Sequence, residues 1–151
     1  VIRAMPTLGI SNGASPIAFC SSKEIENSTS QEILNKLGQC IKIEESKFDA
    51  FTSIFGAGPA YISYLGNLLS EIALSNGFEN PEPLIRDLLK GTYEIHNSAN
   101  QPSFNEIKNM VASKGGVTEA ALKKIGSSRM EEIWKSAIED AINQSKKLGD
   151  N

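Results

Sequence analysis

The residues best suited to chemistry lie in a glycine-bearing segment, 112–118, which leads directly into a predicted helix. This segment offers the backbone N–H groups of Gly115, Gly116, Val117 and Thr118 and the hydroxyls of Ser113 and Thr118. Amides in the first turn of a helix face its positive end, where an anion gains about 0.3–1 kcal/mol from the helix dipole. A carboxylate suits such a site. The alternative is that Ser113 caps the helix while the glycines only turn the chain, and the residues favour neither interpretation.

A second candidate site follows the first β-prone run, at Met5, Pro6 and Thr7. Ligands of open α/β folds bind beyond the carboxyl ends of the strands, so these three residues are candidates for contact with a cofactor. An ordinary strand exit is the alternative interpretation, and it has equal weight.

Two glycines separated by one residue, Gly56 and Gly58, resemble part of a dinucleotide-binding loop. That loop also needs a preceding parallel strand, a third glycine and an acidic residue about twenty positions later, and none of these is present. We therefore interpret the glycines as sites of close approach between helices. Pro59 then suits the first turn of the helix that follows.

The remaining reactive side chains do not form a catalytic or metal-binding pattern. The only histidine, His96, lies near a predicted helix end without an acidic or nucleophilic partner, so we assign it to the surface or to a cap. Cys20 and Cys40 have neither metal-ligand spacing nor the density of a disulfide scaffold, and we expect reduced, partly buried thiols. Glu71 lies among apolar residues and is either a buried acid or solvent-exposed.

The spacing of apolar residues predicts a mainly α chain with a short α/β segment at its start. The predicted strands cover residues 1–4, 16–20 and 41–44, with a helix over 24–39 between the last two. The predicted helices after them begin at Pro59 and continue to Asn76-Gly77, then cover 82–96, 104–112, 117–125 and 129–148. We place a domain boundary near residue 46, which gives domains 1–45 and 46–151.

The composition is that of a globular protein. The 151 residues are 40% hydrophobic and 22% charged, with a net charge of −3 and no cluster of Lys or Arg. We therefore expect no nucleic-acid partner and no membrane partner. Apolar runs fall short of the roughly 18–20 residues that span a bilayer, and no leader opens the chain, so a cytoplasmic location is expected. Val1 in place of Met suggests that an upstream part has been removed.

Taken together, these segments resemble pyrroline-5-carboxylate reductase. The similar positions are Arg3-Ala4-Met5-Pro6, then Glu45, Asp49, Thr52 and Gly56 to Tyr61, then Glu71 and Gly77, then Val111, Ser113, Gly115, Gly116 and Thr118, and finally Ala137, Ala141, Ser145 and Leu148. The resemblance covers nearly the whole chain. It implies a helical dimerisation and substrate-binding domain preceded by the last α/β segment of a Rossmann-type, dinucleotide-binding domain.

The resemblance also implies an activity, which is reduction of 1-pyrroline-5-carboxylate to L-proline in proline biosynthesis. The full-length protein would be an NAD(P)H-dependent oxidoreductase acting on a C–N bond, whereas this fragment alone would be inactive. NADPH or NADH would bind mainly to the missing N-terminal domain, with Met5, Pro6 and Thr7 contributing. The amides of Gly116, Val117 and Thr118, with Ser113 and Gly115 in the same loop, would hold the substrate carboxylate, and the catalytic Thr118 would also hydrogen-bond near the ring nitrogen. Partners would be the small-molecule substrate and a second copy, in a homodimer or a higher oligomer.

The sequence departs from the family pattern at several positions. Thr7 replaces the usual asparagine, Ala57 a serine, Lys114 a proline and Gln144 an arginine. Lys114 and Thr7 lie beside the expected substrate and cofactor positions, so two alternatives stay open. The first alternative to a pyrroline-5-carboxylate reductase is a divergent family member that reduces another cyclic imine. The second is a non-catalytic helical dimerisation module.

Overall fold

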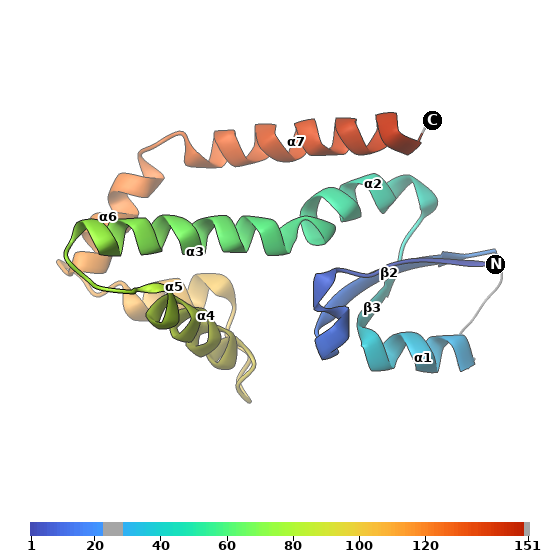
Figure 1. Ribbon diagram of the computed structural model, residues 1–151, viewed down its shortest axis with the longest axis horizontal. Helices are drawn as coiled ribbons and strands as arrows, with labels where there is room; N and C mark the ends of the chain where they lie inside the picture. The colour runs from blue at the N-terminus through green and yellow to red at the C-terminus, as the bar shows by residue number, and fades with distance from the viewer. Residues whose placement is uncertain (23–28, 150–151) are drawn as a thin grey trace. The chain divides into compact units, whose positions relative to one another are not determined.

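In the computed structural model, residues 1–22 and 29–149 are described (Figure 1). The chain divides into two compact units, residues 1–62 with 135–151 and residues 63–134. The first unit contains a three-stranded sheet, and both units contain helices. The predicted boundary near residue 46 separates the α/β segment from the helical segment, which is not where the two compact units divide. This boundary stays a proposal.

The sheet has β2 at its centre. Its strands are β1 (Ile2–Met5), β2 (Ser15–Ser21) and β3 (Gly38–Lys42). β1 pairs with β2 antiparallel and β3 pairs with β2 parallel. The parallel pair needs a crossover, which includes α1 (Thr29–Leu37). The start of the predicted helix over 24–39 lies outside the described residues.

The core of the first unit joins the sheet to the short helices that follow it. Ala18 of β2 packs with Phe48 and Phe51, which belong to α2 (Phe48–Phe51). Met5 and Ile43 are partly buried against this cluster. A π-helix at Thr52–Gly56 follows α2 directly and leads to the first long helix. Burial of a central strand under aromatic side chains removes apolar surface from water and stabilises this unit.

The remaining chain is helical, as the sequence predicted. The helices are α3 (Gly58–Ser75), α4 (Glu82–His96), α5 (Phe104–Val111), α6 (Val117–Gly126) and α7 (Met130–Gly149). α3 ends in a Schellman motif, in which the N–H groups of Gly77 and Phe78 donate to the carbonyls of Leu74 and Ala73 at 3.0 and 3.1 Å. Gly77 has φ +87°, which explains the predicted stop at this glycine.

α4 to α7 contain no buried residue. α3 buries only Gly66 and Ser70, and it exposes Ile62, Tyr64, Leu65, Leu68, Ile72 and Leu74. Gly66 allows close packing on α4, because a Cβ there would lie 3.7 Å from Ile85 and 3.9 Å from Leu89. In the described part of the chain, no helix is both long and apolar enough to cross a bilayer.

Two sequence interpretations need correction, and one open alternative, at Glu71, is settled. The third strand begins at Gly38, three residues before its predicted start, because Gly38 follows α1 directly at φ +154° and approaches Ser15 of β2 closely. Close contact at Gly56 comes from Met5 of β1, whose Cε lies 3.3 Å from the position of an added Cβ, whereas Gly58 has no described neighbour within 4 Å. Glu71 is exposed and accepts a hydrogen bond from Asn67 at 2.7 Å.

Candidate functional site

The loop between α5 and α6 contains the predicted carboxylate-binding residues. Gly115 has φ +74°, a left-handed conformation that disfavours residues with a Cβ. Gly116 is the N-cap of α6, and its N–H donates to the Ser113 carbonyl at 3.0 Å. A Cβ on Gly116 would lie 2.6 Å from Ser113 Oγ. Gly115 is therefore favoured by its backbone conformation, whereas a side chain at Gly116 would require the Ser113 side chain to move.

The helix start is not capped by a side chain. Ser113 contributes its carbonyl to the turn and does not cap α6, which removes the structural alternative raised for its hydroxyl. The amides of Val117 and Thr118, in the first turn, donate to no acceptor among the described residues. The Thr118 side chain is half-buried, and its hydroxyl has no hydrogen-bond partner in the described part of the chain.

Glu119 contacts the glycine loop, and the sequence did not single it out. Its carboxylate accepts the Gly115 N–H at 2.7 Å. Glu119 occupies the third position of α6, the spacing at which an acidic side chain reaches back toward the helix start. A capping box would predict a contact with the N–H of the N-cap Gly116, and Glu119 instead accepts from the residue before it. Two of the four loop amides, at Gly115 and Gly116, are thus already engaged within the chain.

The exit of β1 contains the predicted cofactor-binding residues. Met5 and Pro6 are half-buried, and Met5 ends the strand opposite Ala18. Thr7 is buried, and its polar groups bond within the chain: its N–H donates to Ser15 Oγ at 2.8 Å, its hydroxyl lies 3.2 Å from the same atom, and its carbonyl accepts the Ile10 N–H at 3.1 Å. No signal in the sequence pairs Thr7 with Ser15.

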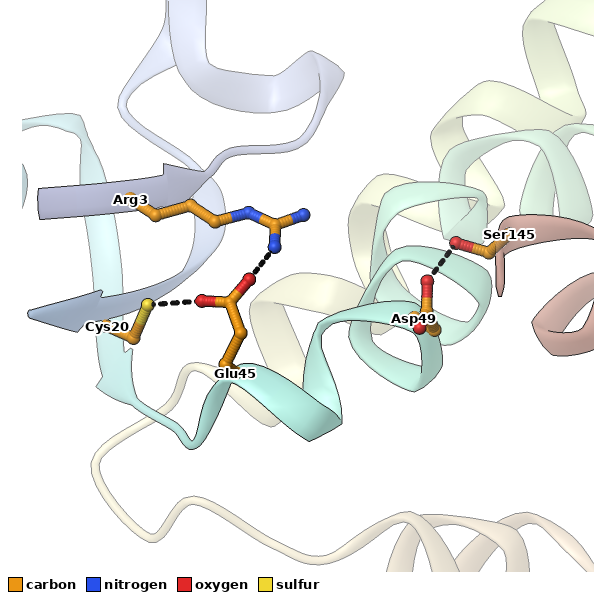
Figure 2. Close-up of polar contacts among 5 residues, drawn as sticks. All are labelled: Arg3, Cys20, Glu45, Asp49 and Ser145. Atoms are coloured by element: carbon orange, nitrogen blue, oxygen red, sulfur yellow. Dashed lines mark hydrogen bonds and ion pairs between the residues drawn. The ribbon is translucent and has the colours of Figure 1, made fainter. Parts of the chain in front are cut away.

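Glu45 connects the sheet to the start of the helical segment. Figure 2 shows its carboxylate accepting from the Arg3 guanidinium of β1 and, at 2.8 Å, from the Cys20 thiol of β2. The Arg3 guanidinium also lies 4.3 Å from the centroid of the Phe48 ring. A second polar tie in Figure 2 joins α2 to α7, where the Ser145 hydroxyl donates to Asp49 at 2.7 Å.

The other reactive side chains are structural. His96 Nδ1 lies 3.0 Å from the Pro102 carbonyl and its ring packs on Phe104, so it joins the end of α4 to the start of α5. Both cysteines are free and half-buried, and burial raises the pKa of the Cys40 thiol, which lowers its thiolate fraction at neutral pH. Among the described residues no cluster of His, Cys, Asp or Glu is suited to a metal ion.

Comparison with known proteins identifies the family. The family described as pyrroline-5-carboxylate reductase dimerisation matches residues 45–148. The chain belongs to this family. Pyrroline-5-carboxylate reductase 2 of Bacillus subtilis is 29% identical over 154 residues, covering 98% of this chain and 55% of the relative. The pyrroline-5-carboxylate reductase of Aquifex aeolicus is 28% identical over 150 residues, with 96% and 55% covered.

Solved structures of this family have the same fold. A pyrroline-5-carboxylate reductase from Coxiella burnetii superposes with a TM-score of 0.85 at 26% identity and covers 97% of this chain and 56% of that one. The pyrroline carboxylate reductase of Plasmodium falciparum, solved with NADP bound, has a TM-score of 0.81 at 26% identity, with 98% and 58% covered. The chain spans a little over half the length of these relatives. The resemblance and the mainly α fold class are confirmed.

Proposed function

We propose that the intact protein reduces 1-pyrroline-5-carboxylate to L-proline with NADPH or NADH, as a step of proline biosynthesis. The observation that carries this proposal is the start of α6. Within the region that matches the family, this glycine-capped helix start has no side-chain cap, and the amides of Val117 and Thr118 have no partner in the described chain. A substrate carboxylate supplies acceptors for these two amides.

The loop then acts mainly by orientation. With the carboxylate held by the Val117 and Thr118 amides, the imine carbon of the ring has a defined position relative to α6. The Thr118 hydroxyl is available to hydrogen-bond the ring nitrogen. Reduction of the C=N bond adds a hydride to its carbon and a proton to its nitrogen, and the proton comes from water. Ser113, Gly115 and Gly116 shape the turn that presents these donors. Ordering the reactants in this way supplies much of the rate enhancement and needs no general acid or base from a histidine or cysteine.

The β1 exit is proposed to contact the nicotinamide cofactor, which supplies the hydride when bound. Met5 and Pro6 are half-buried and apolar, and they fit contact with a ring face better than pairing with a phosphate. Residues 1–45 are proposed to be the end of the dinucleotide-binding domain and residues 46–151 the dimerisation and substrate domain. In this proposal most of the cofactor contacts lie in a part of the protein beyond the present chain.

A homodimer is proposed to cover the exposed apolar face of α3. Ile72 is 50% exposed and Tyr64 is 66% exposed, within the segment that the family model describes as a dimerisation region. A second copy is the partner that would remove this apolar surface from water.

The activity is tested by adding 1-pyrroline-5-carboxylate to the intact protein and following the oxidation of NADPH and of NADH. Turnover that depends on the imine supports the proposal. A folded dimer that binds cofactor without turning over this substrate would point instead to another cyclic imine. A protein that binds neither ligand would support a non-catalytic dimerisation module.

The dimer is tested with Ile72→Glu, which places a charge on the exposed face of α3. We expect this variant of the intact protein to dissociate at concentrations where the parent is dimeric, because a charge in an apolar contact is costly to desolvate. Light scattering after size exclusion measures the mass. Glu71→Gln, on the neighbouring exposed residue, is the control, and an Ile72→Glu variant that stays dimeric would contradict the assignment of this face.

A further inference from the structure

We propose that Thr7 is a positioning residue that acts on the cofactor through Ser15, and that it makes no direct cofactor contact. This inference rests on the proposed function, because it assumes that the β1 exit receives the cofactor. It changes the role of one residue that the sequence assigned to cofactor binding, and it adds Ser15, which the sequence did not single out.

The hydrogen bonds of the Thr7–Ser15 pair use up the donors of Thr7, which supports this role. A serine hydroxyl has one hydrogen, and Ser15 Oγ donates it to the Pro16 carbonyl at 3.0 Å. Ser15 Oγ can therefore only accept from Thr7, both from the backbone N–H at 2.8 Å and from the hydroxyl at 3.2 Å. Thr7 thus donates both of its hydrogens to Ser15, and neither remains for a phosphate or carboxamide oxygen of a cofactor.

The burial of this pair also argues against direct contact. Thr7 is 7% exposed and Ser15 is 2% exposed. The Ser15 backbone is tightly enclosed as well, because a Cβ on Gly38 would lie 1.9 Å from the Ser15 carbonyl oxygen. Ser15 is therefore a fixed acceptor at the start of β2, and Thr7 is held to it by two hydrogen bonds.

As a consequence, both neighbours of Pro6 in the chain, Met5 and Thr7, are held in place. Met5 is held in the sheet opposite Ala18 and packs against the core cluster that contains Phe48. Thr7 is held by Ser15. The ring of Pro6 fixes its own φ near −65°, so little freedom remains between the two anchors. The pair of hydroxyls thereby sets the surface that Met5 and Pro6 present to the cofactor.

The test uses three variants of the intact protein: Thr7→Val, Thr7→Ser and Ser15→Ala. We expect Thr7→Val and Ser15→Ala each to raise the Kd for NADPH by about tenfold, because each removes the hydrogen bond between the two hydroxyls that fixes the exit. Ser15→Ala also leaves the Thr7 N–H without its acceptor. Thr7→Ser keeps the hydroxyl and should stay within about twofold of the parent. Binding is measured by titration calorimetry, with thermal unfolding recorded for every variant.

Two further readouts separate positioning from loss of structure. The KM for the cofactor should rise while the KM for the imine substrate stays at the parent value. The Thr7→Val/Ser15→Ala double variant should be no worse than Ser15→Ala alone, because Ser15 is the acceptor through which the Thr7 hydroxyl acts. Ser15→Cys, which keeps the size and a weak acceptor, replaces Ser15→Ala if the alanine variant does not fold.

The outcomes are distinct. If Thr7→Val weakens NADPH binding while Ser15→Ala and Ser15→Cys bind like the parent, Thr7 touches the cofactor directly and the positioning role is wrong. If all variants bind like the parent, the positioning role is also wrong, while the proposed function stands. If the unaltered intact protein binds neither NADPH nor NADH, the proposed function fails and this inference fails with it.

Discussion

α5 and α6 follow each other in the chain, but their N-termini are built differently. α5 begins with a capping box, in which Ser103 Oγ accepts the Glu106 N–H at 3.2 Å and the Glu106 carboxylate accepts the Ser103 N–H at 2.7 Å. α6 begins with Gly116, which has no side chain to offer, and its acidic residue reaches only to Gly115. In α5 the capping box satisfies backbone N–H groups at the helix start and stabilises the helix. The helix without a side-chain cap is less stable by roughly a few tenths of a kcal/mol, because glycine is a tolerated N-cap, and its first turn keeps amides without an acceptor in the described chain.

Thr118→Ala tests the ligand side of this difference most directly. If the Thr118 hydroxyl bonds the ring nitrogen, which is charged once it is protonated, kcat/KM of the intact protein should fall by roughly tenfold to a hundredfold, since a hydrogen bond to a charged group contributes about 1.5–3 kcal/mol. Thermal stability should change little, because the hydroxyl has no partner in the described chain. Thr92→Ala is the matched control, because the Thr92 hydroxyl donates to the Leu88 carbonyl within exposed α4. Unchanged kinetics in Thr118→Ala would rule out this placement of the substrate.

Gly116→Asp makes α6 resemble α5. A carboxylate at the N-cap would accept an amide of the first turn and repel a bound anion, so the KM for the imine carboxylate should rise by about tenfold. Gly116→Ala is the control, because it introduces the same Cβ close to Ser113 without the carboxylate. Steady-state kinetics on both variants isolate the effect of the cap. Equal KM values in the two variants would mean that the turn does not bind the substrate.

Ser103→Ala removes the cap of α5. The loss should lower the free energy of unfolding by about 1 kcal/mol without changing the KM for either substrate. The pKa of the Glu106 carboxyl lies below its usual value, because the Ser103 hydroxyl and then the Ser103 N–H stabilise the carboxylate. A lowered pKa in the folded state contributes stability above the unfolded pKa, and this contribution is lost as the pH falls through the folded pKa.

The stability difference between the parent and Ser103→Ala should therefore shrink in acid, below the usual range of a glutamate carboxyl. Chemical denaturation at neutral and acidic pH measures it. A difference that does not depend on pH would show that the Ser103 hydroxyl does not stabilise the Glu106 carboxylate.

Glu119→Gln should have the smallest effect. Its side-chain oxygen can still accept the Gly115 N–H, but the negative charge beside the α6 donors is removed. The KM for the imine carboxylate should fall by about twofold, as expected for a partly screened charge at a helix end. Glu139→Gln, on exposed α7, is the control for a general charge effect. A rise in KM instead would mean that the charge holds the loop in its binding conformation.

Much of the fold could be predicted from the sequence. The interval from Glu82 to His96 was predicted as a helix and is α4, and the stop at Gly77 is a Schellman motif. These features depend on apolar spacing and on residues that begin or end helices, which act over a few positions along the chain. The glycine loop before α6 was predicted for the same reason, although its ligand stays a proposal.

By itself, then, the sequence determined the helices, their ends and the loop that offers amides at the start of α6. Only the tertiary structure decided which of these groups are free. It paired Thr7 with Ser15, joined Arg3 and Cys20 through Glu45, and started β3 at Gly38. Each of these contacts links residues from different parts of the chain. Their partners depend on how strands and helices pack, and no local pattern of residue types contains that information.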